Sequence, residues 1–219
     1  MRSTYAHNSQ TYSAGGWRIG YAIFPDTAFG ATVKKVTLAY ASECWSAASA
    51  PAQEAAAVAF DTSSEMDLYR TQVTRLHRHC TTALYNALID CGLAVAPPKG
   101  AFYLYPSFHP YAEQLEKMGI RTSQQLSHWL VESCGIAALP GSAFGEDDAG
   151  LQGGRYRLRM ATSYLFFQDE NARYTKGYEL IDNAMLENAA ASGQLPMLDK
   201  AIQAIQTAVK KVLEANALP

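Results

Sequence analysis

A long helical pattern between residues 63 and 91 constrains the fold of this chain more than any other feature. Ser63 and Ser64 are suited to cap a helix, and two acidic residues follow in its first turn. Apolar residues then recur near helical spacing until Gly92, a residue that favours a helix end. They are Leu68, Val73, Leu76, Cys80, Leu84, Ala87 and Leu88. The pattern predicts one long helix over these residues.

Shorter patterns lie on both sides of this helix. Aromatic or β-branched runs bounded by proline or glycine predict strands at residues 17–24, 101–105, 136–139 and 155–161. Further helices are expected at residues 28–42, 51–60, 122–134 and 168–190. A last amphipathic helix carries a stripe from Leu198 to Leu213, which we assign to the core or to a dimer contact. This order of elements favours a helix-rich α+β fold.

Composition and charge exclude several classes of protein. Of the 219 residues, 48% are hydrophobic and 17% are charged, as in a globular chain. The net charge of -2 gives no reason to expect binding to nucleic acid, and no apolar run is long enough for a membrane span. The four cysteines form no paired motif and the N-terminus has no apolar signal core. We therefore expect no metal site and a cytoplasmic location.

Four motifs in sequence order resemble the class I/II (fold-type I) aminotransferases, which use pyridoxal phosphate (PLP). The first is the cofactor-attachment segment, Ser9-Gln10-Thr11-Tyr12 followed by Gly16-Trp17-Arg18-Ile19-Gly20. The others are Pro98-Lys99-Gly100-Ala101-Phe102-Tyr103, Pro140-Gly141-Ser142-Ala143-Phe144-Gly145 and Tyr156-Arg157-Leu158. The resemblance covers roughly residues 8–190 and implies an α/β lobe like the small domain of the family. It further implies a remnant of the large domain at 1–50, the small-domain-like region at 51–190 and a terminal helix at 191–219.

The chain departs from the family pattern at Gln10, which stands where the family has the lysine that binds PLP. A lysine amine condenses with the cofactor aldehyde and carries protons, whereas an amide nitrogen is not nucleophilic. The family also places its phosphate-binding helix and pyridine-pairing aspartate upstream of that lysine, and this sequence begins at Met1. On these grounds we expect no bound cofactor.

Two arginines carry the binding roles that the resemblance implies. Arg18 corresponds to the arginine that contacts the cofactor phosphate, and Arg157 to the one that holds the substrate carboxylate. Arg155 and Arg159 lie two residues on either side of Arg157, so all three project from one face of a strand. The alternative for each arginine is an ordinary ion pair with a local carboxylate.

Other candidate residues surround these arginines in the sequence. Gln10, His7 and Tyr12 are the candidates for proton transfer or oxyanion hydrogen bonds. Trp17 and Tyr103 join Arg18, Arg157 and Arg159 as candidates for substrate binding, although core packing is the simpler role for Trp17 and for Trp45. His77 and His79 point to different sides of their helix and do not suggest a metal site.

Three functions are compatible with these features. The first is a repurposed enzyme that performs PLP-independent cyclisation, isomerisation or addition on a small carboxylate-bearing metabolite, in a biosynthetic setting. The second is a catalytically dead pseudo-aminotransferase that binds a ligand or a partner subunit. The third is residual aminotransferase activity with PLP held non-covalently. Strand 17–24 needs a pairing partner, which can be a second copy, the chain's own N-terminus or the last helix. We expect a homodimer that buries this strand and the last helix.

Overall fold

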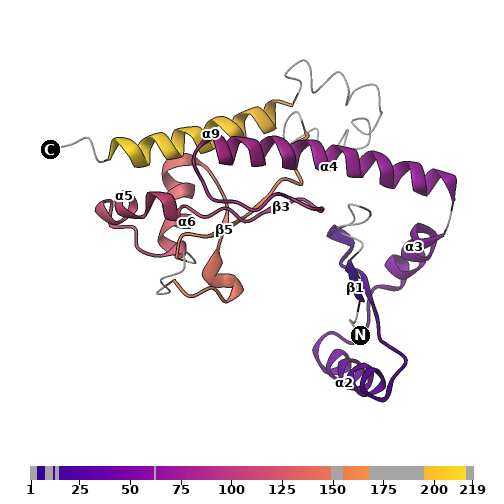
Figure 1. Cartoon of the computed structure of the whole chain (residues 1–219). Helices are drawn as coiled ribbons and strands as arrows, with labels where there is room; N and C mark the ends of the chain where they lie inside the picture. Colours follow the sequence, from indigo (N-terminus) through magenta and orange to yellow (C-terminus); the bar gives the residue numbers. More distant parts are fainter. Residues whose placement is uncertain are drawn as a thin grey trace. The chain divides into compact units, whose positions relative to one another are not determined.

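A computed structural model describes residues 12, 15–61, 63–148, 155–167 and 195–215, together with the backbone of residues 4–7 (Figure 1). The chain divides into two compact units, Met1–Val73 and Thr74–Pro219. The helix predicted at residues 168–190 lies outside the described residues, and the sequence-based boundaries at residues 50 and 190 stay predictions.

The first unit contains a two-stranded antiparallel sheet. Strand β1 (Thr4–His7) pairs with β2 (Gly20–Ile23), so that Thr4 lies opposite Ile23 and His7 opposite Gly20. Strand β2 is shorter than the expected 17–24, because residues 15–17 form a 3-10 turn, η1, and Arg18 has a left-handed φ of 53°. The apolar strand therefore pairs with the N-terminal segment of its own chain.

Two helices complete the first unit. Helix α2 (Ala28–Cys44) begins at Thr27, whose hydroxyl accepts a hydrogen bond of 3.0 Å from the Gly30 amide. Helix α3 (Ala50–Phe60) has Pro51 in its first turn, where the missing N–H has no cost. Both helices were predicted from the sequence, within one or two residues at most ends.

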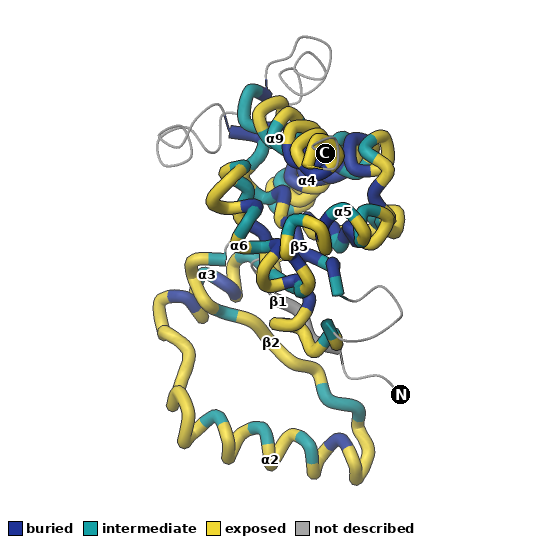
Figure 2. Tube along the Cα trace, turned by 90° about the vertical axis from the view of Figure 1, so that its left-hand side faces the viewer, coloured by how far each residue is buried: buried dark blue, intermediate teal, exposed yellow. Residues whose placement is uncertain are grey.

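Much of the apolar surface of the first unit is exposed (Figure 2). In α2 only Gly30 is buried, while Phe29, Val36 and Tyr40 are 63–72% exposed. Trp17 and Trp45 are 55% and 59% exposed, so core packing was the wrong expectation for both within the described structure. Both rings belong to elements with almost no buried residues: Trp17 lies in η1, which has none, and Trp45 is the C-cap of α2, where only Gly30 is buried.

The long helix α4 (Ser64–Asp90) matches the predicted pattern and crosses the boundary between the two units. Gly92, with φ of 75°, ends it as expected. The second unit then adds η2 (His109–Tyr111), α5 (Ala112–Lys117), α6 (Ser123–Cys134) and α9 (Pro196–Glu214). Thr122 caps α6 by accepting from the Gln125 amide at 3.1 Å, and Gly135 closes it in a left-handed conformation.

A small antiparallel sheet with the order β3-β5-β4 lies at the centre of the second unit. Its strands are β3 (Tyr103–Leu104), β4 (Leu139–Pro140) and β5 (Leu158–Ala161). Leu104 pairs with Met160, and Pro140 pairs with Leu158. The sequence located all three strands but made them too long, because prolines and glycines next to them limit the regular pairing.

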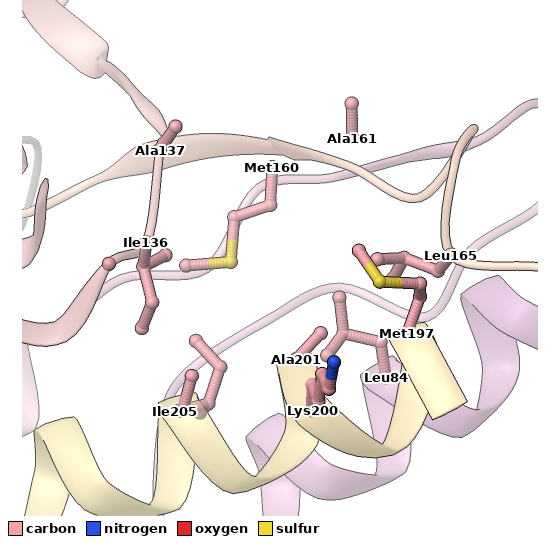
Figure 3. A pocket seen from close by; sticks show the side chains of 12 residues that line it. Leu84, Ile136, Ala137, Met160, Ala161, Leu165, Met197, Lys200, Ala201 and Ile205 are labelled. Atoms are coloured by element: carbon pink, nitrogen blue, oxygen red, sulfur yellow. The ribbon is translucent and has the colours of Figure 1, made fainter. Parts of the chain in front are cut away.

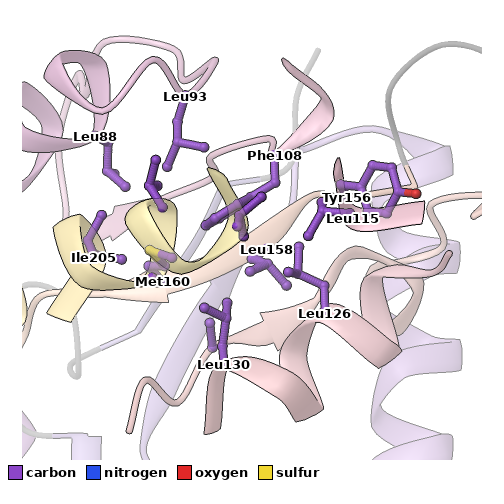
Figure 4. Close-up of a cluster of buried hydrophobic side chains, with 14 of the residues drawn as sticks. Leu88, Leu93, Phe108, Leu115, Leu126, Leu130, Tyr156, Leu158, Met160 and Ile205 are labelled. Carbon is purple, nitrogen blue, oxygen red and sulfur yellow. The ribbon is translucent and has the colours of Figure 1, made fainter. Parts of the chain in front are cut away.

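The core of the second unit is built on the inner face of β5 (Figure 4). Leu158 and Met160 of β5 meet Leu88 of α4, Leu130 of α6 and Ile205 of α9 there. The stripe of the last helix also lies in this core: Leu198, Ile205, Val209 and Val212 are all buried. Of the two roles expected for that stripe, the structure shows core packing.

Candidate functional site: the arginine face of strand β5

Burial alternates along the chain from residue 155 to residue 160. Tyr156, Leu158 and Met160 are 0–5% exposed, whereas Arg155, Arg157 and Arg159 are only partly buried. Arg159 lies in β5 and Arg157 in a β-bridge just before it, so their side chains point to the face away from the core, whereas Arg155 lies in the turn that precedes the strand. The shared strand face that the sequence predicted for three arginines therefore holds for Arg157 and Arg159, while the predicted strand was too long at Arg155.

Arg155 has the pairing expected of a structural residue. Its Nη1 atom lies 2.6 Å from Oε1 of Glu116, and its Nε donates to the carbonyl of Asp148 at 3.1 Å. These contacts tie the strand to α5 and to the loop that follows η3 (Gly141–Phe144). Here the alternative of a local ion pair is the correct one.

Arg157 faces a carboxylate of its own chain. Its Nη1 atom lies 3.1 Å from Oε1 and 3.5 Å from Oε2 of Glu146. Both oxygens use the same nitrogen, so this contact differs from the two-nitrogen fork by which arginine binds a carboxylate most strongly. Among the described residues, no other side chain engages the Arg157 guanidinium.

Arg159 lies between two aromatic rings. The guanidinium carbon is 4.8 Å from the ring centre of Tyr103 and 4.5 Å from that of Phe144. Both distances are in the range of cation–π contacts. In the part of the chain that the structure describes, no carboxylate lies within ion-pair distance of Arg159.

The loop 141–148 is fixed in front of these arginines by a set of hydrogen bonds. The Gly141 amide donates to the Arg157 carbonyl at 2.8 Å. Ser123, at the start of α6, donates from its amide and hydroxyl to the Asp148 carboxylate at 2.9 and 3.0 Å. The Ser142 amide in turn donates to the Ser123 hydroxyl at 3.2 Å. These contacts set the positions from which Phe144 and Glu146 reach the arginine face.

The hydroxyl of Tyr105 is buried beside this loop. If Gly141 carried a Cβ atom, that atom would lie 3.0 Å from the Tyr105 hydroxyl oxygen, so the hydroxyl lies close to the loop. Within the described residues, the hydroxyl makes no hydrogen bond of normal geometry. Burial raises the pKa of Tyr105, and the negative charge of Glu146 raises it further. An interaction of the hydroxyl with the Glu146 side chain contributes to the same rise, so the hydroxyl stays protonated.

Sequence reasoning missed Tyr105, Phe144 and Glu146 as site residues. Tyr105 lies two residues after Tyr103, and Glu146 directly follows the Phe-Gly pair of the loop motif. Strand alternation is a signal that points to Tyr105, since it places residues 103 and 105 on one face. The contact of Glu146 depends on how the loop folds back, which no local pattern encodes.

The candidates in the first unit are less fully described. Arg18 is exposed, and its Nη1 donates to the Gly15 carbonyl at 3.1 Å. Tyr12 is buried: its ring packs edge-on against Phe60, and its carbonyl accepts from the Tyr69 hydroxyl at 2.9 Å. His7 belongs to the backbone of β1, and Gln10 lies outside the described residues.

A cavity of about 340 Å³ lies on another side of the second unit (Figure 3). Ile136, Met160, Leu165 and Ile205 point into it, and Lys200 brings its amine to the wall. Such walls can hold an apolar group but offer little to orient a reacting one. We therefore assign the chemistry to the arginine face.

His77 is buried between two aromatic rings. The ring centres of Phe102 and Phe166 lie 5.1 and 5.6 Å from that of His77, and burial lowers the pKa of the imidazole. Within the described ranges, no group of three His, Cys, Asp or Glu side chains is arranged to hold a metal ion. No described helix is both long and apolar enough to cross a membrane.

The second unit is thus an α+β lobe with a row of arginines beside its central sheet. Residues 8–164 match the family model for aminotransferase class I and II. The chain therefore belongs to the class I and II aminotransferase family. This result confirms the family and the fold class that the sequence motifs indicated.

Individual relatives agree with this placement. A probable aspartate/prephenate aminotransferase of Aquifex aeolicus is 34% identical over 137 residues, covering 63% of this chain and 32% of that protein. The aspartate aminotransferase of Geobacillus stearothermophilus is 31% identical over 156 residues, covering 71% and 35%. The structure of N-succinyldiaminopimelate aminotransferase from Mycobacterium tuberculosis shares the fold, with a TM-score of 0.59 at 22% identity, covering 94% of this chain and 41% of that one. The chain spans about a third of the length of these curated relatives.

The family assignment corrects the expectation that no cofactor is used. The matching relatives are PLP-dependent aminotransferases, so PLP is the cofactor to consider for this chain. The error lay in treating the lysine and the residues upstream of it as the only anchors, although charge-assisted hydrogen bonds from an arginine to the phosphate also hold such a cofactor. Arg18 fits that role, because the described contacts use only its Nη1 atom and leave the guanidinium exposed.

Replacing Gly141 by alanine tests how tightly the loop is fitted to β5. The new Cβ would lie 3.1 Å from the Arg157 carbonyl oxygen and 3.3 Å from the Arg157 Cβ. We expect G141A to lower the free energy of unfolding by about 1–2 kcal/mol, because overpacking exceeds the entropic gain from losing a glycine. Urea unfolding followed by circular dichroism measures the change.

Gly100→Ala is the matched control, since a Cβ there would meet nothing within 4 Å. It should leave the stability unchanged or raise it by up to about 1 kcal/mol. An equal response of the two variants would show that the loop is not closely packed on the strand.

Proposed function

We propose that this chain binds the carboxylate of an amino acid or of its 2-oxo acid at Arg157, as a PLP-using member of its family. The observation that carries the proposal is the contact of Arg157 with Glu146, 3.1 Å from a carboxylate oxygen. A guanidinium that faces a carboxylate in this way is already placed for carboxylate recognition. The names of the relatives, which include aspartate aminotransferases, support the same substrate class.

The partial engagement of Arg157 leaves room for a ligand. Glu146 uses Nη1 alone, so Nη2 and Nε keep donors directed away from that contact. The two side chains are 40% and 23% exposed, and ion pairs at such sites contribute about 0–1 kcal/mol. A substrate carboxylate that binds two nitrogens of Arg157 would therefore displace only a weak ion pair with Glu146. Tyr105 can donate its hydroxyl hydrogen to the same group.

The residues proposed to contact the cofactor and to transfer protons lie in the first unit. When bound, PLP supplies an electron sink for the amino-acid α-carbon. Arg18 would hold its phosphate, and Trp17 lies next to it in the sequence with an exposed ring. Gln10 can donate and accept hydrogen bonds but cannot bond covalently to an aldehyde. Proton transfer then falls to His7 or Tyr12, the nearby residues whose side chains exchange protons.

Gln10 favours a second candidate function, which is ligand binding without turnover. A pseudo-aminotransferase of this kind would keep the carboxylate site of β5 and act as a partner of an active subunit. Transamination assays with PLP, an amino acid and a 2-oxo acid separate the two functions. Turnover that depends on Arg157 supports the enzyme, and binding without turnover supports the pseudo-enzyme.

The Arg157→Gln variant tests the carboxylate site directly. We expect R157Q to weaken the binding of 2-oxopentanoate about tenfold or more, because a charge-assisted hydrogen-bond pair is lost. Ligand-observed NMR titration of the full chain measures the affinity. Arg155→Gln is the control two residues away, because Arg155 is already engaged by Glu116 and the Asp148 carbonyl. A wild-type affinity in R157Q would refute the site.

Adding PLP to the chain tests the role of Arg18. We expect saturable binding of PLP to the wild type without borohydride fixation at residue 10, and weaker binding in Arg18→Gln. The Gln10→Lys variant should gain a cofactor that borohydride fixes at that residue, because it restores a primary amine. Absorption spectra and peptide mass spectrometry report the two effects. Arg121→Gln, an exposed arginine of the second unit, controls for surface charge. Equal PLP affinity of R18Q and the wild type would count against Arg18.

The exposed face of α2 supports a homodimer, the state typical of this family. Phe29, Val33, Val36 and Tyr40 follow helical spacing and so lie on one face, and three of them are 63–72% exposed. We propose that this face contacts a second copy of the chain, because exposed apolar stripes of this kind mark protein interfaces.

Light scattering coupled to size exclusion tests this contact. At micromolar concentration the wild type should elute as a dimer, and Phe29→Asp should shift it to the monomer, since a buried charge opposes association. Lys34→Asp, on the same helix at an exposed position, should leave the dimer intact. A monomeric wild type would contradict the proposal.

A further inference from the structure

The cavity beside α9 has a deep apolar wall and a mouth that reaches solvent (Figure 3). Leu84, Met160 and Ile205 form the deep wall, where they are 2–5% exposed. Lys200 and Ala161 lie at the mouth and are exposed. The cavity therefore leads from solvent toward the core of the second unit, so that a molecule inside it would have one hydrated end and one buried end.

The volume of the cavity, about 340 Å³, is large for a space among packed side chains. It is more than twice the roughly 150 Å³ of an engineered apolar cavity that takes up benzene. Small side chains at Ala137, Ala201 and Ala204 leave this space unfilled. Because water finds few hydrogen-bond partners on such walls, the deep part of the cavity favours an apolar guest over water.

The shape of the cavity suits an unbranched chain. Its lining residues in α9 run from Met197 to Ile205, a helix length of roughly 12 Å. The side chains of Met160 and Met197 both point into the space (Figure 3). Methionine is flexible and fills irregular gaps, so these walls can adapt to an alkyl chain.

Lys200 sets the charge that the hydrated end of a guest should carry. Its amine lies at the wall, and it is the only charged side chain among the described residues that line the cavity. The described ion pairs of lysine belong to Lys117 and Lys210, so none of the described carboxylates lies within ion-pair distance of Lys200. Asp199 is its neighbour in sequence, but consecutive residues of a helix do not face each other. An anionic head group therefore complements the mouth.

We infer that this cavity binds a medium-chain fatty acid, with its carboxylate at the Lys200 amine and its alkyl chain against Met160 and Ile205. Met160 follows Arg159 in β5, so the cavity lies on the face of the strand opposite to that arginine. Occupancy of the cavity is independent of the proposed function, because none of its lining residues takes part in the proposed carboxylate or cofactor site.

Fatty acids of increasing length test the site by ligand-observed NMR titration of the full chain. The affinity should rise about fourfold for each methylene from butanoate to octanoate, because each added group leaves water for the cavity. Octan-1-ol should bind about fivefold more weakly than octanoate, and octylammonium more weakly still, because neither pairs with Lys200. An affinity that does not change with chain length would overturn the proposal.

Variants of α9 locate the bound acid. Lys200→Met should remove the preference for octanoate over octan-1-ol, and Lys200→Arg should keep it. Ala204→Leu fills part of the cavity and should weaken octanoate binding about tenfold or more. Lys210→Met and Gln203→Leu, at exposed positions of the same helix outside the cavity, should bind like the wild type. If K200M and A204L are folded by circular dichroism and bind octanoate like the wild type, the acid binds elsewhere and the proposal is wrong.

Methionine methyl signals provide a second measurement, on the wild type, that does not depend on any variant folding. In protein with isotope-labelled methionine methyl groups, octanoate should shift the signals of Met160 and Met197. The signal of Met66, at the start of α4 in the first unit, should stay unchanged. Unshifted signals of Met160 and Met197 at saturating octanoate would contradict binding in the cavity.

Two probes distinguish this site from the one proposed at Arg157. R157Q should bind octanoate like the wild type, and K200M should bind 2-oxopentanoate like the wild type. Loss of octanoate binding in folded R157Q would place the carboxylate at the arginine face and overturn the cavity site. If 2-oxopentanoate fails to bind while octanoate shifts the two methionines, the proposed function fails and the cavity site stands.

Discussion

The burial of one face of β5 is the constraint on which the rest of the second unit depends. Tyr156, Leu158 and Met160 enter the core between α4, α6 and α9, and the Tyr156 hydroxyl donates to the Ile120 carbonyl at 3.1 Å. A register shift of one residue would place three arginines in that core, at a cost no set of described contacts offsets. The hydrophobic effect therefore fixes the outward direction of the guanidinium groups. The positions of these groups depend on how the inner face packs in the core.

The three arginines differ in the groups that balance their positive charges. Arg155 is engaged by Glu116 and by the Asp148 carbonyl, which makes it part of the support for the loop. Arg157 meets Glu146 through one nitrogen, and Arg159 is covered by rings instead of a carboxylate. The three arginines thus differ in their described partners: two side-chain and backbone acceptors for Arg155, one carboxylate for Arg157 and two rings for Arg159.

The sequence predicted the parts of this site that depend on local pattern. The alternation predicted that Arg157 and Arg159 share a face, and the caps at Thr122 and Gly135 predicted the ends of α6. It did not predict the partners, because Glu146 and Phe144 reach the strand only through a loop fixed by Ser123 and Asp148. Trp17 and Trp45 were assigned to a core on residue type alone, although burial also depends on the direction that the turns impose. The cofactor was wrongly excluded because the lysine and the residues upstream of it were taken to stand for the whole binding energy.

Gln10 and Arg157 therefore concern separable properties of the chain. An amine at residue 10 governs covalent attachment and proton transfer, which are matters of nucleophilicity and pKa. Carboxylate recognition at Arg157 is a matter of geometry, and the core and loop contacts of the second unit maintain that geometry by themselves. Thr162 anchors the end of β5 to α4 through a 2.7 Å contact with the Thr81 hydroxyl and to β3 through the Phe102 carbonyl. The described contacts that orient Arg157 lie within the second unit, so the proposed carboxylate site can be tested separately from the proposed role of residue 10.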